Sequence, residues 1–244
     1  MPFTILSYSQ LDSTNEEALR LIANGKAGEF MVVQAEEQTA GRGAGKNQWE
    51  SRAGRNLTFS IILRPRFLPP ARQFVLTQMI SLALWNVAAR RLDKKALFIK
   101  WPNDLWYKDK KLAGVLVQNR INGNLLDFSV LGIGLNVNQK SFVSDAPNPA
   151  SLIHFTGKEE TVSALLSEIL RQVEVLYRKI HSDISSLNAL YLKKLYRMNQ
   201  QAVYADAHGR FTAMITGVDS YGRLLLLDSN GNLRTYGFKE VRFL

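Results

Sequence analysis

The sequence contains no cysteine among its 244 residues. Without thiols the chain cannot form disulfides or thiolate metal sites, and an intracellular location fits without being required. The N-terminus lacks the basic stretch and apolar core of a secretory signal. The longest apolar-rich region, residues 74–89, is interrupted by polar side chains and is shorter than the ~20 residues of a membrane span. We therefore expect a soluble, cytoplasmic protein that does not enter a membrane.

Metal-binding and hydrolase signatures are absent as well. The three histidines, His154, His181 and His208, show no metal-ligand spacing with one another. No GxSxG nucleophile motif occurs, although a serine-histidine-aspartate triad could still form in the fold. We treat the three histidines as surface or structural residues and assign no metal ligand to the protein itself.

Positive charge is in excess, because 31 lysines and arginines face 21 aspartates and glutamates, a net charge of +10. Such a surface attracts phosphates, nucleic acids or acidic proteins. The basic residues are scattered, and no RNA-binding aromatic motif or zinc-finger spacing accompanies them. A solvated basic surface is therefore favoured over a nucleic-acid site, and an acidic protein partner would also suit this charge.

Length and a hydrophobic content of 46% indicate one large domain and a second, smaller one. Ser13 or Thr14 can cap a first helix, since a glutamate follows each three residues later. Apolar residues alternate with Thr58 and Ser60, which is typical of a half-buried strand. Periodicity predicts strands at residues 3–8, 30–35, 57–63, 97–100, 105–107, 112–119 and 125–135, and helices at residues 13–25, 70–92, 161–180 and 184–196. This order indicates an α+β domain with a mixed, largely antiparallel sheet.

The last part of the chain has a different pattern. From about Ala202, short apolar runs alternate with turn signals, which predicts about five short strands. We expect a small SH3-like β-barrel there. With the boundary near Arg197, the predicted domains are residues 1–196 and residues 197–244.

The segment from Glu37 to Asn56 is long, polar and aperiodic, and such loops are usually functional or disordered. Its glycines free the backbone to approach an anion. Arg42 and Lys46 add positive charge, and Trp49 offers a flat face, so the loop could wrap a phosphate and stack a base. The GxxxxGK[ST] spacing of a Walker loop is absent. A flexible surface turn explains this segment equally well.

Two further clusters lie at the ends of predicted strands. Asp104 closes the sequence KWPND, where it could bind a metal ion or orient an amine. A tight turn is the favoured explanation of those five residues alone. Lys111 opens the sequence KLAG, where it could hold a carboxylate or a phosphate. A solvated charge run would be the preferred explanation without its neighbours.

The fourth cluster is the sequence GIGLNVN at residues 132–138. Gly132 and Gly134 remove two side chains from one face of a strand, which leaves room for a flat ligand or a close backbone. Asn136 would lie on that same face and could contact an adenine edge. A bent or bulged strand has about equal weight.

In this order the clusters resemble the biotin protein ligase family. The resemblance runs from Asp12 to about Asn138, and the small C-terminal β domain also fits. Each motif is weak alone, but together they are a strong signal; they are STN at 13–15, QTAGRG at 38–43, KWPND at 100–104, KLAG at 111–114 and GIGLN at 132–136. The family has a class II synthetase-like catalytic fold that it shares with lipoate ligases and octanoyltransferases. KWPND followed by KLAG resembles the biotin branch.

The resemblance implies an ATP-dependent ligase. It would convert biotin to biotinyl-5'-AMP with release of pyrophosphate, and transfer biotin to a lysine of a biotin carboxyl carrier protein. ATP and Mg²⁺ would be required, with no tightly bound prosthetic group. Since the chain begins at the catalytic domain, we expect a monofunctional form without an N-terminal DNA-binding domain. No nucleic-acid partner is expected, and a sheet edge could pair in a homodimer or with the carrier.

The resemblance also assigns residues. Ser13, Thr14 and Gln38 would bind the ureido head of biotin. The implied biotin site comprises Ser13, Thr14, Asn15, Gln38, Gly41, Arg42, Gly43, Lys111, Gly114, Gly132 and Gly134. The implied ATP and adenylate site comprises Arg42, Ala44, Lys46, Trp49, Lys111 and Asn136. Lys111, Arg42 and Asp104 are the implied catalytic residues, with Asp104 positioning or deprotonating the incoming lysine.

One departure from the family pattern concerns the glycine-rich loop. Many members carry more arginines there, whereas Ala44 and Asn47 stand at two such positions in this chain. Lys46, Arg52 and Arg55 remain nearby, so phosphate contacts could be redistributed. Two alternatives to a biotin ligase stay open: a related enzyme acting on lipoate or octanoate, and a non-catalytic basic module that binds nucleic acid.

Overall fold

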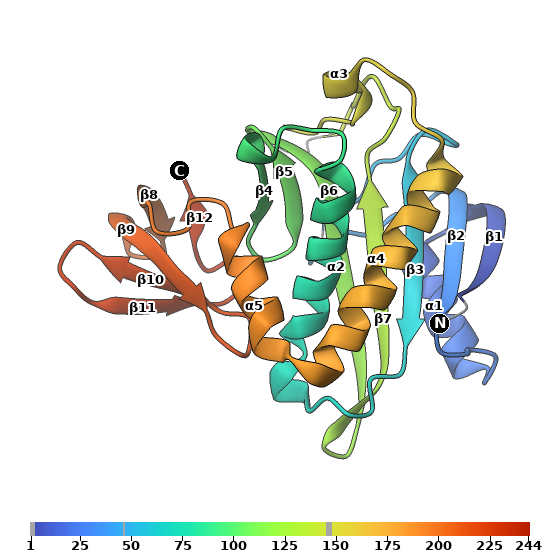
Figure 1. Ribbon diagram of the computed structural model, residues 1–244, viewed down its shortest axis with the longest axis horizontal. Coiled ribbons are helices and arrows are strands. Elements are labelled where there is room, and N and C mark those ends of the chain that lie inside the picture. Colours follow the sequence, from blue (N-terminus) through green and yellow to red (C-terminus); the bar gives the residue numbers. More distant parts are fainter. Residues whose placement is uncertain (1–2, 46, 145–147) are drawn as a thin grey trace.

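A computed structural model describes residues 3–45, 47–144 and 148–244 of the chain. Figure 1 shows a large sheet covered by helices and, beside it, a small second sheet formed by the C-terminal part. The strands of the large sheet are β1 (Thr4–Leu11), β2 (Met31–Gln38), β3 (Leu57–Leu63), β4 (Leu97–Lys100), β5 (Asp104–Tyr107), β6 (Lys110–Asn122) and β7 (Leu125–Leu135). The α-helices are α1 (Thr14–Ala23), α2 (Phe74–Ala88), α3 (Ile153–Thr156), α4 (Val162–Ser182) and α5 (Ile184–Lys193).

The large sheet has the strand order β1-β2-β3-β7-β6-β5-β4. Only the β1–β2 pair is parallel, because α1 connects these two strands and carries the chain back to the same end of the sheet. The other neighbouring pairs are antiparallel. The α+β class and the mixed, largely antiparallel sheet predicted from the sequence are thus confirmed.

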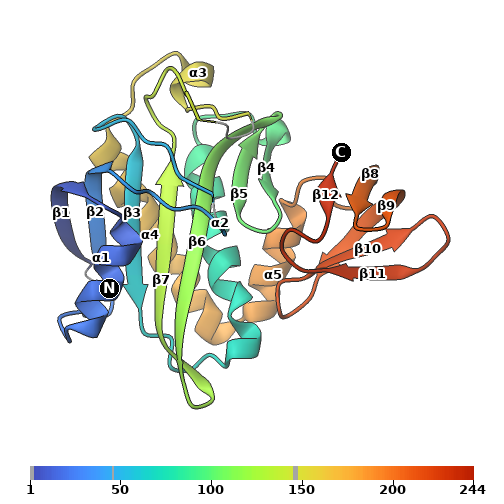
Figure 2. The same cartoon turned by 180° about the vertical axis from the view of Figure 1, so that it is seen from behind.

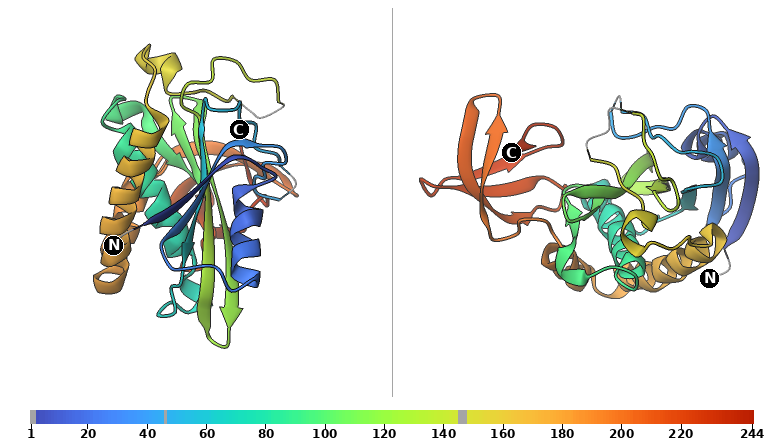
Figure 3. Two further views of the ribbon diagram at one scale, coloured as in Figure 1. Left: turned by 90° about the vertical axis from the view of Figure 1, so that its right-hand side faces the viewer. Right: turned by 90° about the horizontal axis from the view of Figure 1, so that it is seen from above.

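Helices cover both faces of this sheet. Figures 2 and 3 show α1 on one face and the pair α2 and α4 on the other. Strand β3 is therefore buried along its whole length, and the expectation of a half-buried strand is wrong. Thr58 and Ser60 do point away from the α2 side, but α1 packs over that second face and removes them from water.

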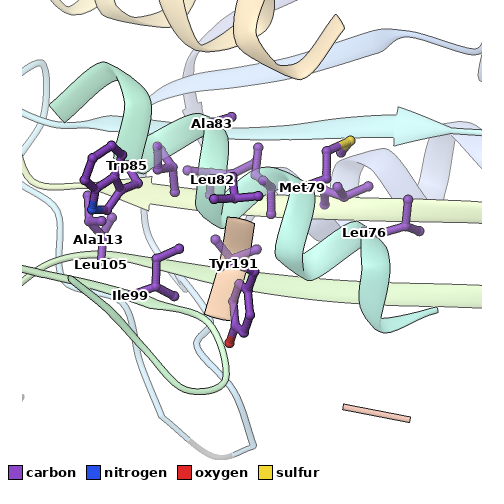
Figure 4. Packing of buried hydrophobic residues seen from close by; sticks show 14 of the residues in the cluster. Leu76, Met79, Leu82, Ala83, Trp85, Ile99, Leu105, Ala113 and Tyr191 are labelled. Carbon is purple, nitrogen blue, oxygen red and sulfur yellow. The ribbon is translucent and has the colours of Figure 1, made fainter. Parts of the chain in front are cut away.

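Helix α2 forms the centre of the core. Most of its side chains are buried, as expected for a helix enclosed between a sheet and two further helices, α4 and α5. Figure 4 shows Leu76, Met79 and Leu82 of α2 packed among apolar residues of the sheet and Tyr191 of α5. The buried indole N–H of Trp85 in α2 is paired, since Nε1 donates to Leu97 O over 2.9 Å.

The second sheet contains β8 (Gln201–Asp206), β9 (Gly209–Val218), β10 (Leu224–Asp228), β11 (Leu233–Tyr236) and β12 (Arg242–Phe243). Its order is β11-β10-β9-β8-β12, with antiparallel neighbours throughout. This five-stranded arrangement agrees with the small SH3-like barrel predicted for the C-terminal part. A domain boundary between residues 196 and 197 remains our proposal; the first strand of this sheet begins at Gln201.

The two sheets are joined by specific contacts as well as by the chain. Trp101 Nε1, at the end of β4, donates to Gly222 O of the β9–β10 turn over 2.9 Å. The ring of Phe74 lies so close to Gly222 that a methyl group there would be 2.4 Å from it. These contacts hold the second sheet beside the β4–β5 end of the first, as the view from above in Figure 3 shows.

None of the helices described is both long and apolar enough to cross a bilayer.

Strands β1 and β4 form the two edges of the large sheet. Pairing of such an edge in a homodimer stays a prediction.

Candidate active site

A cavity of about 580 Å³ opens on the α1 side of the large sheet. It brings together segments that are far apart in the sequence. The predicted site residues that line it are Ser13, Thr14, Asn15, Gln38, Arg42, Gly43, Ala44, Trp49, Asp104, Lys111, Gly114, Gly132, Gly134 and Asn136. Gly41 is buried at the base of the adjoining loop and is not among the lining residues. Lys46 lies outside the described residues.

Strand register produces the base of the cavity. Gly134 of β7 pairs with Thr58 of β3 on one side and with Gly114 of β6 on the other. Gly114 in turn pairs with Asp104 of β5, which pairs with Lys100 of β4. Paired residues share one face of a sheet, so these five residues form a row across it. A second row, Ser60–Gly132–Leu116, runs beside the first.

A buried polar network joins the second row to the start of α1. Ser60 Oγ lies 2.8 Å from Thr14 Oγ1 and 2.6 Å from Asn15 Oδ1. Asn15 Nδ2 donates to Gln118 Oε1 over 2.7 Å. We call Thr14, Asn15, Ser60, Gln118 and Gly132 the floor of the site. Thr14, Asn15 and Ser60 are each at most 4% exposed, so the network positions their polar atoms firmly.

The start of α1 differs from the predicted capping box. Ser13 occupies the N-cap position, but its side chain makes no capping hydrogen bond. Gln38 Oε1 accepts from the backbone N–H of Thr14 over 2.8 Å instead, so a side chain from β2 takes over this role. Ser13 therefore keeps its hydroxyl for the cavity that it lines.

The two glycines of β7 leave space, as predicted, but side chains of the chain itself enter that space. A methyl group on Gly132 would lie 2.0 Å from Asn15 Oδ1. A methyl group on Gly134 would lie 2.1 Å from the indole ring of Trp49. Gly132 thus permits the floor network, and Gly134 permits a flat ring to lie directly on the sheet.

The glycine-rich loop is folded back on itself. Gly43 N donates to Asn47 O over 2.8 Å, and Trp49 N donates to Gly41 O over 2.9 Å, on either side of an Arg42–Gln48 bridge. Residues 41–45 and 47–49 therefore form two sides of a hairpin, which we call the rim hairpin. Its closure directs Trp49 onto Gly134, where the indole N–H is buried and has no hydrogen-bond partner among the residues that the structure describes.

A cation of the rim hairpin is held away from the floor. Arg42 Nη1 lies 2.7 Å from Glu16 Oε1 of α1, and the Arg42 side chain is 62% exposed. Arg55, which follows the hairpin, pairs with Glu159 over 3.0 Å. Arg42 is available at the mouth of the cavity because an exposed ion pair of this kind contributes little to stability and is readily exchanged.

Lys111 and Asp104 form an ion pair inside the cavity. Lys111 Nζ lies 2.8 Å from Asp104 Oδ1, and each side chain is 25% exposed. A bulge between β5 and β6 pairs Trp106 with Lys111 rather than with Leu112, which turns Lys111 to the same face as Asp104. Lys111 N also donates to Asn148 O over 2.9 Å, so the segment after β7 fixes its backbone.

Lys100 completes the positive side of this pair. Burial lowers the pKa of its ammonium group, while the nearby Asp104 carboxylate opposes that shift. Its Nζ lies 3.8 Å from the centre of the Trp106 ring and 5.1 Å from that of Phe243 in the second sheet. Asp104 therefore has a cation on each side. Lys111 forms an ion pair with it, whereas Lys100 interacts with it at longer range.

Asn136 lies just beyond β7, at the edge of the cavity. Its Nδ2 donates to Ala150 O over 3.2 Å, and the residue is buried. Its Oδ1 is buried and has no hydrogen-bond partner among the described residues. A buried acceptor left open in this way can receive a donor from a ligand.

Several lining residues were not predicted. They come from the segment after β7 and from the second sheet, namely Phe142, Ser144, Pro149 and Phe238. Glu50 holds part of this segment, since its carboxylate accepts from the backbone N–H groups of Val143 and Ser144. Burial raises the pKa of Glu50, but these hydrogen bonds outweigh it and leave the pKa below its ordinary value. No local pattern in the sequence around Phe142, Ser144 and Pro149 indicates that they return to the cavity.

Comparison with known proteins gives a consistent set of relatives. A sequence model of the Biotin/lipoate A/B protein ligase family matches residues 6–136. The chain is 37% identical to a biotin–[acetyl-CoA-carboxylase] ligase from Paracoccus denitrificans, over 89% of this chain and 92% of that protein. It is 28% identical to a bifunctional ligase/repressor BirA from Bacillus spizizenii, over 95% of this chain and 72% of that protein.

Solved structures agree in fold. A biotin protein ligase from Aquifex aeolicus in complex with biotin and ATP superposes with a TM-score of 0.80 at 23% identity, covering 99% of both chains. A biotin protein ligase from Leishmania major in complex with biotinyl-5-AMP has a TM-score of 0.67 at 20% identity, over 97% of this chain and 100% of that one. Both sheets of the molecule are included in these matches.

Proposed function

The chain belongs to the biotin/lipoate A/B protein ligase family, and we propose that it is an ATP-dependent biotin protein ligase. The observation that carries this proposal is the convergence of five separate motifs on one cavity of about 580 Å³. That volume lies within the roughly 300–1,000 Å³ typical of ligand sites. The Paracoccus denitrificans relative and the two solved structures named above are biotin ligases by their names, which favours biotin as the substrate.

The floor suits the head of biotin. A ureido group offers two N–H donors and one carbonyl acceptor, and it is uncharged. Ser13, Thr14 and Gln38 present hydroxyl and amide groups at the cavity wall. The floor network orients Thr14, and the backbone N–H of Thr14 orients Gln38, before a ligand arrives. Polar groups that are already oriented in a buried site bind a neutral polar ligand selectively, because a ligand without matching groups would leave them unpaired.

The nucleotide would lie between the rim hairpin and the end of β7. The open Oδ1 of Asn136 can accept a hydrogen bond from the exocyclic amino group of adenine. Trp49 offers a flat face for packing against the base or for covering the intermediate. Arg42 and Lys111 supply cations for the phosphates. Mg²⁺ accompanying ATP would neutralise further phosphate charge.

The first reaction step joins biotin to AMP. A carboxylate oxygen of biotin forms a bond to the α-phosphorus of ATP, and the bond from that phosphorus to the bridging oxygen breaks, so that pyrophosphate leaves with the electron pair. Negative charge grows on the phosphates as this happens. Lys111 lies on the cavity face beside Gly114 and would stabilise that charge, because fixed cations in a partly dehydrated site act strongly on a transition state.

The second step transfers biotin to a lysine amine. The amine nitrogen bonds to the acyl carbon, the bond from that carbon to the phosphate oxygen breaks, and AMP leaves. The attacking amine must be neutral and must shed a proton on forming the amide. Asp104, at the cavity wall, would position this amine and accept or guide the proton. The carrier would be a biotin carboxyl carrier domain of a biotin-dependent carboxylase.

The decisive experiment is incubation of the protein with biotin, ATP, Mg²⁺ and a biotin carboxyl carrier domain. We expect the carrier to gain the mass of one biotinyl group on a single lysine, and pyrophosphate to form in equal amount. Folded protein that leaves the carrier unmodified would contradict the proposal. Parallel reactions with lipoate or octanoate separate the related enzyme activities, and salt-dependent binding of DNA or RNA would favour the nucleic-acid alternative.

A further inference from the structure

A turn of the second sheet reaches the cavity of the first. Residues 237–241 connect β11 and β12, and Phe238 of this turn lines the cavity. The turn is closed twice: Gly237 N donates to Glu240 Oε2 over 2.6 Å, and Glu240 N donates to Gly237 O over 3.2 Å. Its position beside the cavity is therefore set by its own hydrogen bonds as well as by the packing of the sheet.

Lys239 follows Phe238 and contacts the rim hairpin. Its backbone has a φ of +69°, in the left-handed region that residues other than glycine adopt rarely. Its Nζ would be 2.7 Å from a methyl group built on Gly45, at the tip of the hairpin. The ammonium group thus lies directly against the glycine-rich backbone, although Gly45 and Lys239 are far apart in the sequence.

Lys239 differs from the cations of the cavity in its ion pairs. Arg42 pairs with Glu16, and Lys111 pairs with Asp104. Within the described residues, Lys239 has no carboxylate at ion-pair distance. The neighbouring Glu240 carboxylate accepts from the turn backbone instead. A cation at the hairpin tip whose charge no described carboxylate balances is suited to a polyanionic ligand.

The described part of the hairpin, residues 41–45 and 47–49, has one cation, Arg42, and it pairs with Glu16. Ala44 and Asn47, near the tip, are uncharged. We propose that Lys239 supplies a further cation here and contacts the phosphates of ATP, so that the second sheet forms part of the nucleotide site. Phe238 forms the adjoining wall. This inference rests on the proposed function, because it assigns a further binding residue for the same reaction.

The test compares three substitutions of Lys239 in pyrophosphate release at varied ATP and varied biotin. We expect Lys239→Ala to raise the KM for ATP about three- to tenfold while the KM for biotin stays unchanged, since one partly exposed phosphate contact is lost. Lys239→Glu should have a larger effect in the same direction, and Lys239→Arg should restore most of the ATP affinity. The difference should shrink at high ionic strength.

Arg210→Ala is the matched control, because Arg210 is an exposed cation of the same sheet that does not line the active-site cavity. It should leave both KM values as they are. Equal behaviour of Lys239→Ala and the unmutated protein, or a parallel rise of both KM values that Lys239→Arg does not reverse, would overturn the inference. The second result would indicate that Lys239 only braces the hairpin.

Failure of the proposed function can be distinguished from failure of this inference. Unmutated protein that binds ATP but releases no pyrophosphate with biotin would contradict the ligase activity. ATP titration of the same three variants would still decide whether Lys239 contacts the nucleotide.

Discussion

The floor and the rim hairpin of the cavity are built in different ways. The floor joins the start of α1 to paired strands, and the buried side chains of Thr14, Asn15 and Ser60 are bonded to one another. The rim hairpin is a loop, and Arg42 on it forms an ion pair across the mouth while remaining 62% exposed. A lost partner in a buried network costs about 1–3 kcal/mol, whereas an exposed pair contributes little.

Because of this difference, the two regions are suited to different ligands. The floor is suited to recognising a neutral, rigid ligand such as the biotin head, because its geometry is fixed in advance. The rim hairpin is suited to a charged nucleotide, because flexible surface cations can follow phosphates through the reaction. Lys111 and Asp104 stand where the two regions meet. Substitutions on each side should therefore affect different kinetic constants.

The largest effect is expected at Lys111. Lys111→Ala removes the cation nearest to the reacting centre, and we expect pyrophosphate release to fall by a factor of about 100 to 1,000. Lys110→Ala is the matched control, because Lys110 is the adjacent residue, is exposed and does not line the cavity. Near-normal pyrophosphate release by Lys111→Ala would contradict the role assigned to it.

Asp104→Asn should separate the two steps. The amide keeps the shape of the side chain but cannot accept the proton of the attacking amine, so biotin transfer to the carrier should slow by about 100-fold. Formation of the adenylate, measured by pyrophosphate release in a single turnover, should change much less. Asp109→Asn, an exposed carboxylate in the same β5–β6 turn, serves as control. A uniform loss in both steps would show that Asp104 mainly maintains the position of Lys111.

A pair of glycine substitutions tests the division between floor and rim directly. Gly132→Ala places a methyl group against Asn15, and we expect the KM for biotin to rise by about tenfold as the floor network shifts. Gly134→Ala instead displaces the ring of Trp49, which should weaken ATP binding or retention of the adenylate.

Gly28→Ala is the control for both, because a methyl group there meets nothing within 4 Å. Thermal unfolding of each variant reports whether the fold has survived. If Gly132→Ala and Gly134→Ala altered the same constant to the same extent, floor and rim would not be separate regions.

The smallest effect is expected at Arg42. Arg42→Ala should raise the KM for ATP only about threefold, and less at high salt, because the guanidinium is exposed and can be replaced by neighbouring cations. Arg20→Ala removes another exposed ion pair from α1, away from the cavity, and should have no such effect. A loss as large as that of Lys111→Ala would place Arg42 among the residues on which catalysis chiefly depends.

Much of the fold could be predicted because it follows from local chemistry. The predicted strand over residues 125–135 coincides with β7, and the alternation at Thr58 and Ser60 correctly gives their common face. The error was in their exposure, since a local pattern does not state that α1 will cover that face. The capping box at Ser13 failed for a similar reason, because Gln38 arrives from another strand.

The site was predicted where its residues form motifs and missed where it is assembled from distant segments. The motifs at 13–15, 38–43, 100–104, 111–114 and 132–136 all contribute residues to the cavity. Phe142, Pro149 and Phe238 carry no local signal of this kind. They reach the cavity because the chain after β7 and the turn after β11 pack beside it.

The sequence by itself determined the elements and the chemical groups: glycines at 132 and 134, a lysine at 111 and a carboxylate at 104. Only the tertiary structure decided how they meet. Strand register aligns Gly134 with Gly114, and a bulge turns Lys111 toward Asp104. Packing of the second sheet brings Lys239 to Gly45. Side-chain chemistry is a property of each residue, whereas register and docking depend on the simultaneous burial of surfaces from the whole chain.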